Sequence, residues 1–182
     1  MQKVFVTSDH HFYHEKIIQF QKEEGTRPFE TVEEMNEKLI DRWNKTVGPN
    51  DTVYILGDFS FGNSHKTETV LYQLNGKKHL VIGNHDDHWL KADLKTYFES
   101  IQNYLEYRFK KLSIVMFHYP IAQWNKMHHG SLHLHGHTHG HYKSPGRIMD
   151  VGIDARPNCD YDLWNMEEVV EILLTKEVLK HH

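Results

Sequence analysis

The sequence has almost none of the residues that would build a disulfide scaffold or a membrane span. One cysteine, Cys159, occurs among its 182 residues, so no internal disulfide can form, as is typical of a reducing cytoplasm. No apolar run approaches the roughly 20 residues that a membrane helix needs. The first residues pass from a short apolar stretch directly into polar ones, without the apolar core or cleavage site of a secretory signal. We therefore expect a cytoplasmic protein with no membrane partner.

Basic residues are also too few for a broad nucleic-acid-binding surface. Lys and Arg number 21 against 25 Asp and Glu, which gives a formal net charge of −4. Extended nucleic acid is therefore not an expected partner, although bound divalent cations would add positive charge locally. The sequence has no repeat and no linker, which predicts one domain over residues 1–182. Histidine is abundant, with 17 residues; His181 and His182 are either native or the remnant of a tag and are set aside.

Short apolar runs alternate with amphipathic segments along the chain. A capping box of Thr31 and Glu34 opens one predicted helix, which ends before Gly48, and Asn165 opens another. Shorter helices are predicted over residues 65–74 and 90–98. The runs of strand length are apolar on both faces, as in sheets covered on both sides, and comprise residues 4–6, 52–56, 80–82, 112–117, 132–134 and 148–153. This alternation predicts an α/β layered fold.

Polar residues stand directly after five of these runs. Taken singly, each has an ordinary structural interpretation: Gly57-Asp58 is a strand-ending turn, and a lone His118 is more often a buried, hydrogen-bonded histidine. Open α/β sheets place their ligand crevice at the carboxyl ends of strands, so all five blocks are expected to converge on one site. The blocks contain Asp9 and His11; Asp58; Asn84, His85 and Asp86; His118; and His137 and His139.

These side chains offer oxygen and nitrogen donors and no thiolate. Such a set favours two divalent cations, with Mn preferred over Fe, Zn or Ni. Asp58 can offer one oxygen to each cation, and Asn84 adds a carbonyl oxygen. A pair of cations about 3.5–4 Å apart can lower the pKa of a bridging water and clamp both sides of an in-line displacement at phosphorus. We expect His85 to protonate the leaving oxygen as general acid, with Asp86 orienting its imidazole.

The blocks read, in order, Asp9-His10-His11, Gly57-Asp58, Gly83-Asn84-His85-Asp86, His118 and Gly136-His137-Thr138-His139. In this order they resemble the calcineurin-like metallophosphoesterase superfamily over nearly the whole chain. The resemblance implies a four-layer α/β/β/α sandwich with a dinuclear metal site at the C-terminal ends of the strands. It implies one metal on Asp9, His11, Asp58 and His139, and the other on Asp58, Asn84, His118 and His137.

One block departs from the superfamily pattern. Members often read Gly-Asp-x-x-Asp/Gly, whereas this chain reads Gly57-Asp58-Phe59-Ser60-Phe61-Gly62, with Gly62 one place later than that spacing would set it. The bridging role needs only Asp58, so the departure leaves the predicted metal site intact.

A narrower likeness is to the small single-domain bacterial and phage phosphoesterases of this superfamily. It rests on residues 9–14, Arg27-Pro28-Phe29 and Trp43-Asn44, and it indicates architecture more than substrate. It suggests His14 and Arg27 as substrate-binding residues at the pocket rim, beside Asn84 and His85. The Arg27 guanidinium could contact a phosphate in bidentate fashion or form a surface salt bridge.

The expected function is hydrolysis of a small or nucleotide-like phosphate ester. A chain without room for an inserted cap leaves an open site, which favours diesters mildly. A metallo-β-lactamase-type hydrolase is excluded, because His139 stands where its motif needs Asp and Gly140 where it needs His. The alternative is a non-catalytic metal-binding or nucleic-acid-binding module, which would not need the pair His85 and Asp86.

Overall fold

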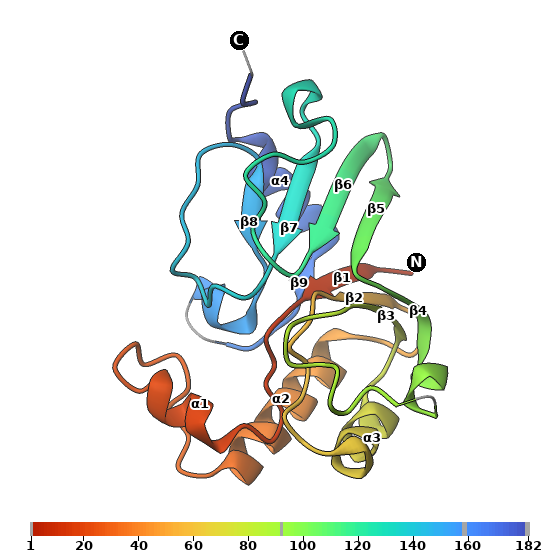
Figure 1. Ribbon diagram of the computed structural model, residues 1–182, viewed down its shortest axis with the longest axis vertical. Coiled ribbons are helices and arrows are strands. Elements are labelled where there is room, and N and C mark those ends of the chain that lie inside the picture. Colours follow the sequence, from red (N-terminus) through yellow and green to blue (C-terminus); the bar gives the residue numbers. More distant parts are fainter. Residues whose placement is uncertain (1, 92, 158–159, 181–182) are drawn as a thin grey trace.

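Two β-sheets pack against each other in the computed structural model (Figure 1), which describes residues 2–91, 93–157 and 160–180. Cys159, His181 and His182 lie outside the described residues. The first sheet has the order β4-β3-β2-β1-β9 and the second β5-β6-β7-β8. The strands of the first sheet are β1 (Val4–Thr7), β2 (Thr52–Ile55), β3 (Lys77–Val81), β4 (Phe98–Gln102) and β9 (Trp164–Asn165). Those of the second are β5 (Tyr104–Phe109), β6 (Leu112–Phe117), β7 (Leu132–His135) and β8 (Ile148–Asp150).

Both sheets are mostly parallel. Strands β1 to β4 run parallel to one another, and the short β9 pairs antiparallel with β1. In the second sheet β6, β7 and β8 are parallel, and β5 is the antiparallel edge strand. Parallel strands end at the same edge of a sheet, so this topology gathers the segments that follow β1, β2 and β3, and those that follow β6 and β7.

The first sheet is covered on both faces. Side chains alternate along a strand, so Phe5 of β1 faces a core beneath the helices while Val6 faces the second sheet. The second and third α-helices cover the outer face of the first sheet. The fourth packs with residues of both sheets in a second core, which lies between the sheets. The α-helices are α1 (Glu15–Phe20), α2 (Val32–Thr46), α3 (Ser64–Gln73) and α4 (Met166–Leu174), with short 3-10 helices η1 (Leu94–Tyr97), η2 (Met127–His129) and η3 (Ile153–Ala155). The predicted sandwich of two sheets flanked by helices is confirmed.

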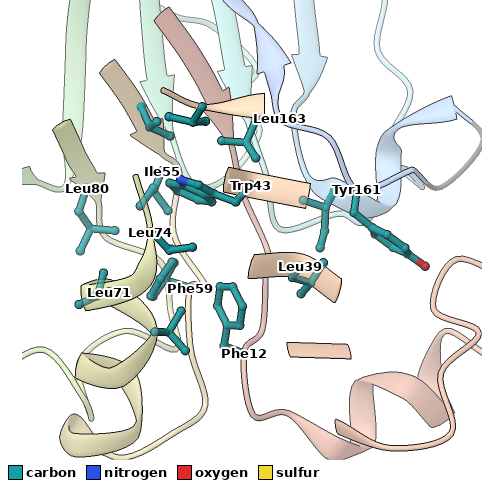
Figure 2. Packing of buried hydrophobic residues seen from close by; sticks show 14 of the residues in the cluster. Phe12, Leu39, Trp43, Ile55, Phe59, Leu71, Leu74, Leu80, Tyr161 and Leu163 are labelled. Atoms are coloured by element: carbon teal, nitrogen blue, oxygen red, sulfur yellow. The ribbon is translucent and has the colours of Figure 1, made fainter. Parts of the chain in front are cut away.

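Helix α2 shows how the sequence sets these elements. The Thr31 hydroxyl accepts a hydrogen bond from the Glu34 backbone N–H at 3.2 Å, as a helix N-cap does. Met35, Leu39 and Trp43 then fall on one face and are buried against the first sheet. Each such side chain contributes about 1.5–3 kcal/mol when fully buried. Figure 2 shows Leu39 and Trp43 in the same core as Phe12 and Phe59, which flank the ligand loops.

The predicted helix over residues 90–98 is wrong in its type and its end. Leu94 and Phe98 are both buried and stand four residues apart, which imitates a helical face. The chain instead makes the 3-10 turn η1, and Phe98 starts the edge strand β4, which pairs with β3. Strand β5 and helix α1, which projects from the body of the protein (Figure 1), were also not predicted.

The outer face of the second sheet has a thinner cover than the first. Val115 of β6 and Ile148 of β8 pack against Trp124 and Met127 from the loop that contains η2. Among the described residues, no helix combines the length and the apolar character needed to cross a membrane.

Candidate metal centre

The structure brings the seven predicted ligands together at the carboxyl ends of β1, β2, β3, β6 and β7. Asp9, His11 and His139 form one group, whose ligand atoms lie within 4.8 Å of one another. A second such group consists of Asp58, His118 and His137.

Asp58 lies between the two groups. Its Oδ2 is 3.9 Å from His11 Nε2 in the first group and 3.5 Å from His118 Nε2 in its own. The Asn84 Oδ1 atom joins the second group at 3.0 Å from His118 Nε2. One oxygen of the Asp58 carboxylate therefore faces both groups, which suits a ligand shared by two cations.

Several donor atoms of the first group are buried without a hydrogen-bond partner. Asp9 Oδ1 and both ring nitrogens of His11 have none, although Asp9 is fully buried and His11 only 3% exposed. A buried polar atom that lacks its partner costs about 1–3 kcal/mol. A divalent cation bound between these atoms would remove that cost, so the donor set fits a metal ion.

Two histidine ligands are oriented by partners on their other ring nitrogen. His118 Nδ1 donates to the Leu56 carbonyl at 2.7 Å, and His139 Nδ1 donates to Asp154 Oδ2 at 2.6 Å. The Nε2 atom of His118 faces Asp58 and Asn84, and the His139 ring is stacked on that of His11 with 5.1 Å between centroids. Carboxylate and carbonyl partners of this kind fix the tautomer and the direction of metal-binding histidines.

The ligand loops have an unusual backbone. Five of the seven predicted ligands adopt a left-handed φ, between 47° and 68°: Asp9, His11, Asp58, His137 and His139. Such a conformation costs an L-residue about 1–2 kcal/mol. Glycine is needed where these loops meet: a Cβ on Gly57 would lie 2.7 Å from His118 Nδ1, and one on Gly136 would collide with Ser8 Oγ and Asp9 Oδ2.

Asp86 does not orient His85, which corrects the sequence-based prediction. Its Oδ2 accepts hydrogen bonds from the backbone N–H groups of Asp58 (3.0 Å) and Gly83 (2.8 Å). Its Oδ1 accepts from the Phe59 backbone at 3.0 Å and from Trp89 Nε1 at 3.1 Å. The fully buried carboxylate therefore ties the Asp58 loop to the Asn84 loop, and none of its four hydrogen bonds comes from the His85 imidazole.

Arg27 is not a rim residue, and its predicted contact with a substrate phosphate is wrong. The side chain is 1% exposed, and all five of its N–H groups have partners inside the protein. Two bonds reach Asp154, at 2.9 and 2.8 Å, and two others reach the carbonyls of Asp9 (2.6 Å) and His10 (2.8 Å). The fifth N–H faces Met35 Sδ at 3.5 Å. The guanidinium thus holds the backbone of the first ligand loop.

Sequence reasoning missed two buried carboxylates at the end of β8. Asp150 Oδ2 accepts hydrogen bonds from Thr138 Oγ1 at 2.6 Å and from the Gly140 backbone at 2.9 Å, so it holds the loop of His137 and His139. Asp154 links His139 to Arg27. Asp154 directly follows the sixth apolar run, over residues 148–153, so the rule applied to the other five runs would have found it, whereas Asp150 lies inside that run.

The predicted substrate-contacting residues His14, Asn84 and His85 lie around the ligands. His85 and Asn84 are exposed, and the His85 backbone N–H donates to Asp58 Oδ1 at 2.9 Å. The His85 ring centroid lies 6.2 Å from that of His11. His14 is half-buried and stacks on Phe61 with 3.7 Å between ring centroids. These positions are compatible with the predicted roles.

The clustered groups perturb one another's protonation. Burial raises the pKa of Asp9 to about 7, helped by the nearby carboxylates of Asp150 and Asp58. Burial alone would lower the pKa of His118, but its contact with Asp58 raises it to about 9. Likewise, burial of Asp154 is outweighed by the Arg27 charge and the His139 hydrogen bond, which lower its pKa to about 2. Without cations the site therefore retains protons that bound cations would displace.

Comparison with known proteins agrees with this geometry. The family model described as calcineurin-like phosphoesterase matches residues 2–175. An uncharacterized protein of Methanocaldococcus jannaschii is 35% identical over 144 residues, which cover 78% of this chain and 72% of that protein. The Gene 66 protein of Mycobacterium phage D29 is 28% identical over 95% of this chain and 96% of its own.

Among solved structures, a protein of unknown function from Aquifex aeolicus has a TM-score of 0.71 and 26% identity. The match covers 94% of this chain and all of that one. The described architecture therefore has a counterpart over nearly its whole length.

Proposed function

The chain belongs to the calcineurin-like phosphoesterase family, and on this premise we propose that it hydrolyses a phosphodiester or phosphomonoester of a small or nucleotide-like alcohol with the help of two divalent cations. The observation that supports this most directly is the pair of Asp/His groups that meet at Asp58. The first group also contains buried donor atoms that have no hydrogen-bond partner, and a bound cation would supply the missing interaction.

Asp9, His11, Asp58 and His139 would hold one cation, and Asp58, Asn84, His118 and His137 the other. The donors are oxygen and nitrogen atoms of intermediate softness, for which we propose Mn ahead of Fe, Zn or Ni. When bound, such a pair lowers the pKa of a water molecule and stabilises the charge on the phosphoryl oxygens.

His85 is the proposed general acid. It is the exposed imidazole beside both groups, and its backbone N–H is fixed on the shared carboxylate of Asp58. A proton from its ring would neutralise the oxygen of the departing alcohol. General acids contribute about 10²–10⁴-fold to such reactions. Asn84, His14 and His85 would line the position of the phosphate.

The exposure of the site favours diesters over monoesters. His137, Asn84 and His85 are all exposed in the described structure. A phosphorus atom held among these side chains could therefore carry two ester substituents that extend into solvent, so the second substituent of a diester would be accommodated.

The test is turnover of a chromogenic monoester and a chromogenic diester with Mn²⁺ added, together with calorimetric measurement of metal stoichiometry. Asp58→Asn should lose metal and activity, and His85→Ala should bind two metal ions but turn over about 10²–10⁴-fold more slowly. His65→Ala, an exposed histidine on α3, is the matched control. If the wild type binds metal but hydrolyses neither ester, or if both site variants match it, the chain is a non-catalytic metal-binding module instead.

A further inference from the structure

Phe61 occupies the segment in which the sequence departs from the superfamily pattern, three residues after Asp58. Its ring is stacked on His14, with 3.7 Å between centroids and 4° between planes. The His85 ring packs on it at 4.5 Å with a tilt of 40°. The metal-ligand candidate His11 lies at 5.2 Å. Phe61 is thus the ring that connects the proposed acid to the rest of the site.

The backbone that carries Phe61 is firmly held. Its N–H donates to the Phe12 carbonyl at 2.8 Å. On either side of it, Ser60 Oγ bonds to Thr67 Oγ1 at 2.8 Å and accepts from the Gly62 N–H at 3.0 Å. Ser60 and Thr67 are fully buried. Because its backbone is fixed and one face is covered by His14, the Phe61 ring offers a rigid surface for a neighbouring side chain to pack on.

The His85 side chain has no comparable polar support. The neighbouring Asp86 has four N–H donors on its two oxygens and none is from His85. Among the described residues, no side chain makes a hydrogen bond to the His85 imidazole, whose contacts are with aromatic rings. An exposed side chain without such support samples several rotamers, which reduces the time spent in the productive one.

We propose that Phe61 positions His85 for proton transfer to the leaving oxygen, in the place of the acidic residue that usually orients a catalytic histidine. The inference rests on the proposed function, in which His85 is the general acid. Phe61 is a positioning residue, because its side chain has no atom that could bind a metal ion or donate a proton. The competing explanation is that Phe61 only supports the packing of His11, which would affect every substrate equally.

The difference between these two roles appears in the dependence of kcat/KM on the leaving group. A general acid helps poor leaving groups most, because a good one departs without a proton. The assay uses methyl phosphodiesters of 4-nitrophenol, phenol and benzyl alcohol, with Mn²⁺ at saturation and the metal content of each variant measured. Phe61→Leu is expected to lose less than about 3-fold on the 4-nitrophenyl ester and about 10–100-fold on the benzyl ester, part of what the acid contributes.

Two further variants sharpen the test. Phe61→Tyr keeps the ring and should restore the wild-type dependence on the leaving group. Phe20→Leu is the matched control. Phe20 is 64% exposed, and its ring centroid lies 6.1 Å from that of His14, but it is not part of the contact between Phe61 and His85. It should leave the dependence unchanged.

The double variant Phe61→Leu/His85→Ala decides whether the effect passes through His85. If it does, the kcat/KM of the double variant equals that of His85→Ala on every ester, because the effects of two residues that act as one unit do not add. An equal loss on all three esters, or a full Phe61→Leu effect in the His85→Ala background, would overturn the positioning role while the proposed hydrolysis stands. If His85→Ala hydrolyses the benzyl ester at the wild-type rate, the general acid of the proposed function fails, and this inference fails with it.

Discussion

Replacing Asp86 by Asn tests whether this carboxylate holds the metal loops or orients the acid. The change keeps the size of the side chain and turns one acceptor oxygen into an NH₂ group. Each Asp86 oxygen accepts two N–H groups: Asp58 and Gly83 on Oδ2, and Phe59 and Trp89 on Oδ1. Whichever oxygen is replaced, the new NH₂ faces two N–H donors.

The structure sets the size of the effect. Two hydrogen bonds are lost, and two buried donors are left without an acceptor. At about 1–3 kcal/mol for each unsatisfied group, Asp86→Asn should lower the free energy of unfolding by about 2–6 kcal/mol. This is a large part of the about 5–15 kcal/mol that stabilises a typical domain. Because the Asp58 backbone is one of the two donors on Oδ2, metal affinity should fall as well.

Urea unfolding of the metal-free protein and calorimetric titration with Mn²⁺ measure the two effects. Asp87→Asn is the control, because it makes the same chemical change at the next residue, on an exposed side chain. A loss below about 1 kcal/mol with unchanged metal affinity would refute the role in holding the loops. A normal stability combined with a selective loss on esters of poor leaving groups would restore the role of orienting His85.

Three other perturbations follow from the same contacts. Arg27→Ala leaves the buried Asp154 charge without its partner and should cost about 3–5 kcal/mol in urea unfolding; a raised KM at unchanged stability would instead mean that Arg27 reaches the substrate. The folded-state pKa of His118, about 9, lies above its ordinary value of 6.5, so its stabilising effect is complete below pH 6.5 and fades as the pH rises. From this group, metal-free protein in chelator should therefore lose up to about 2 kcal/mol of its free energy of unfolding between pH 6.5 and 8; His118→Gln should remove that part of the slope and leave the smaller part due to Asp9, whose pKa is about 7. Gly136→Ala puts a Cβ into Ser8 and should abolish binding of at least one cation in a Mn²⁺ titration, whereas retained stoichiometry would show that the loop can shift.

The position of the site was predictable because it depends on local pattern. Apolar runs on both faces identified strands of a sheet that is covered on both sides, and polar residues after five of these runs located the edge where they meet. The roles of Asp86 and Arg27 were not predictable in this way. Arg27 contacts Asp154, 127 residues away, and the sequence does not say which oxygen or N–H group a side chain will meet after such a closure. Adjacency to His85 suggested a contact for Asp86, but its carboxylate points to the backbone of another loop.

The left-handed backbone at the ligands is the least predictable feature and explains the buried carboxylates behind them. Glycine would adopt this left-handed backbone without strain, but it has no side chain that could bind a metal. All five of these predicted ligands are therefore residues that pay the steric cost. At about 1–2 kcal/mol each, their strain sums to about 5–10 kcal/mol, comparable with the stability of a whole domain. The hydrogen bonds that Asp86 and Asp150 accept, and those within the Arg27–Asp154 pair, offset part of it. Cations that satisfy the unpartnered donors would offset more of it, so metal binding and the folding of these loops are linked.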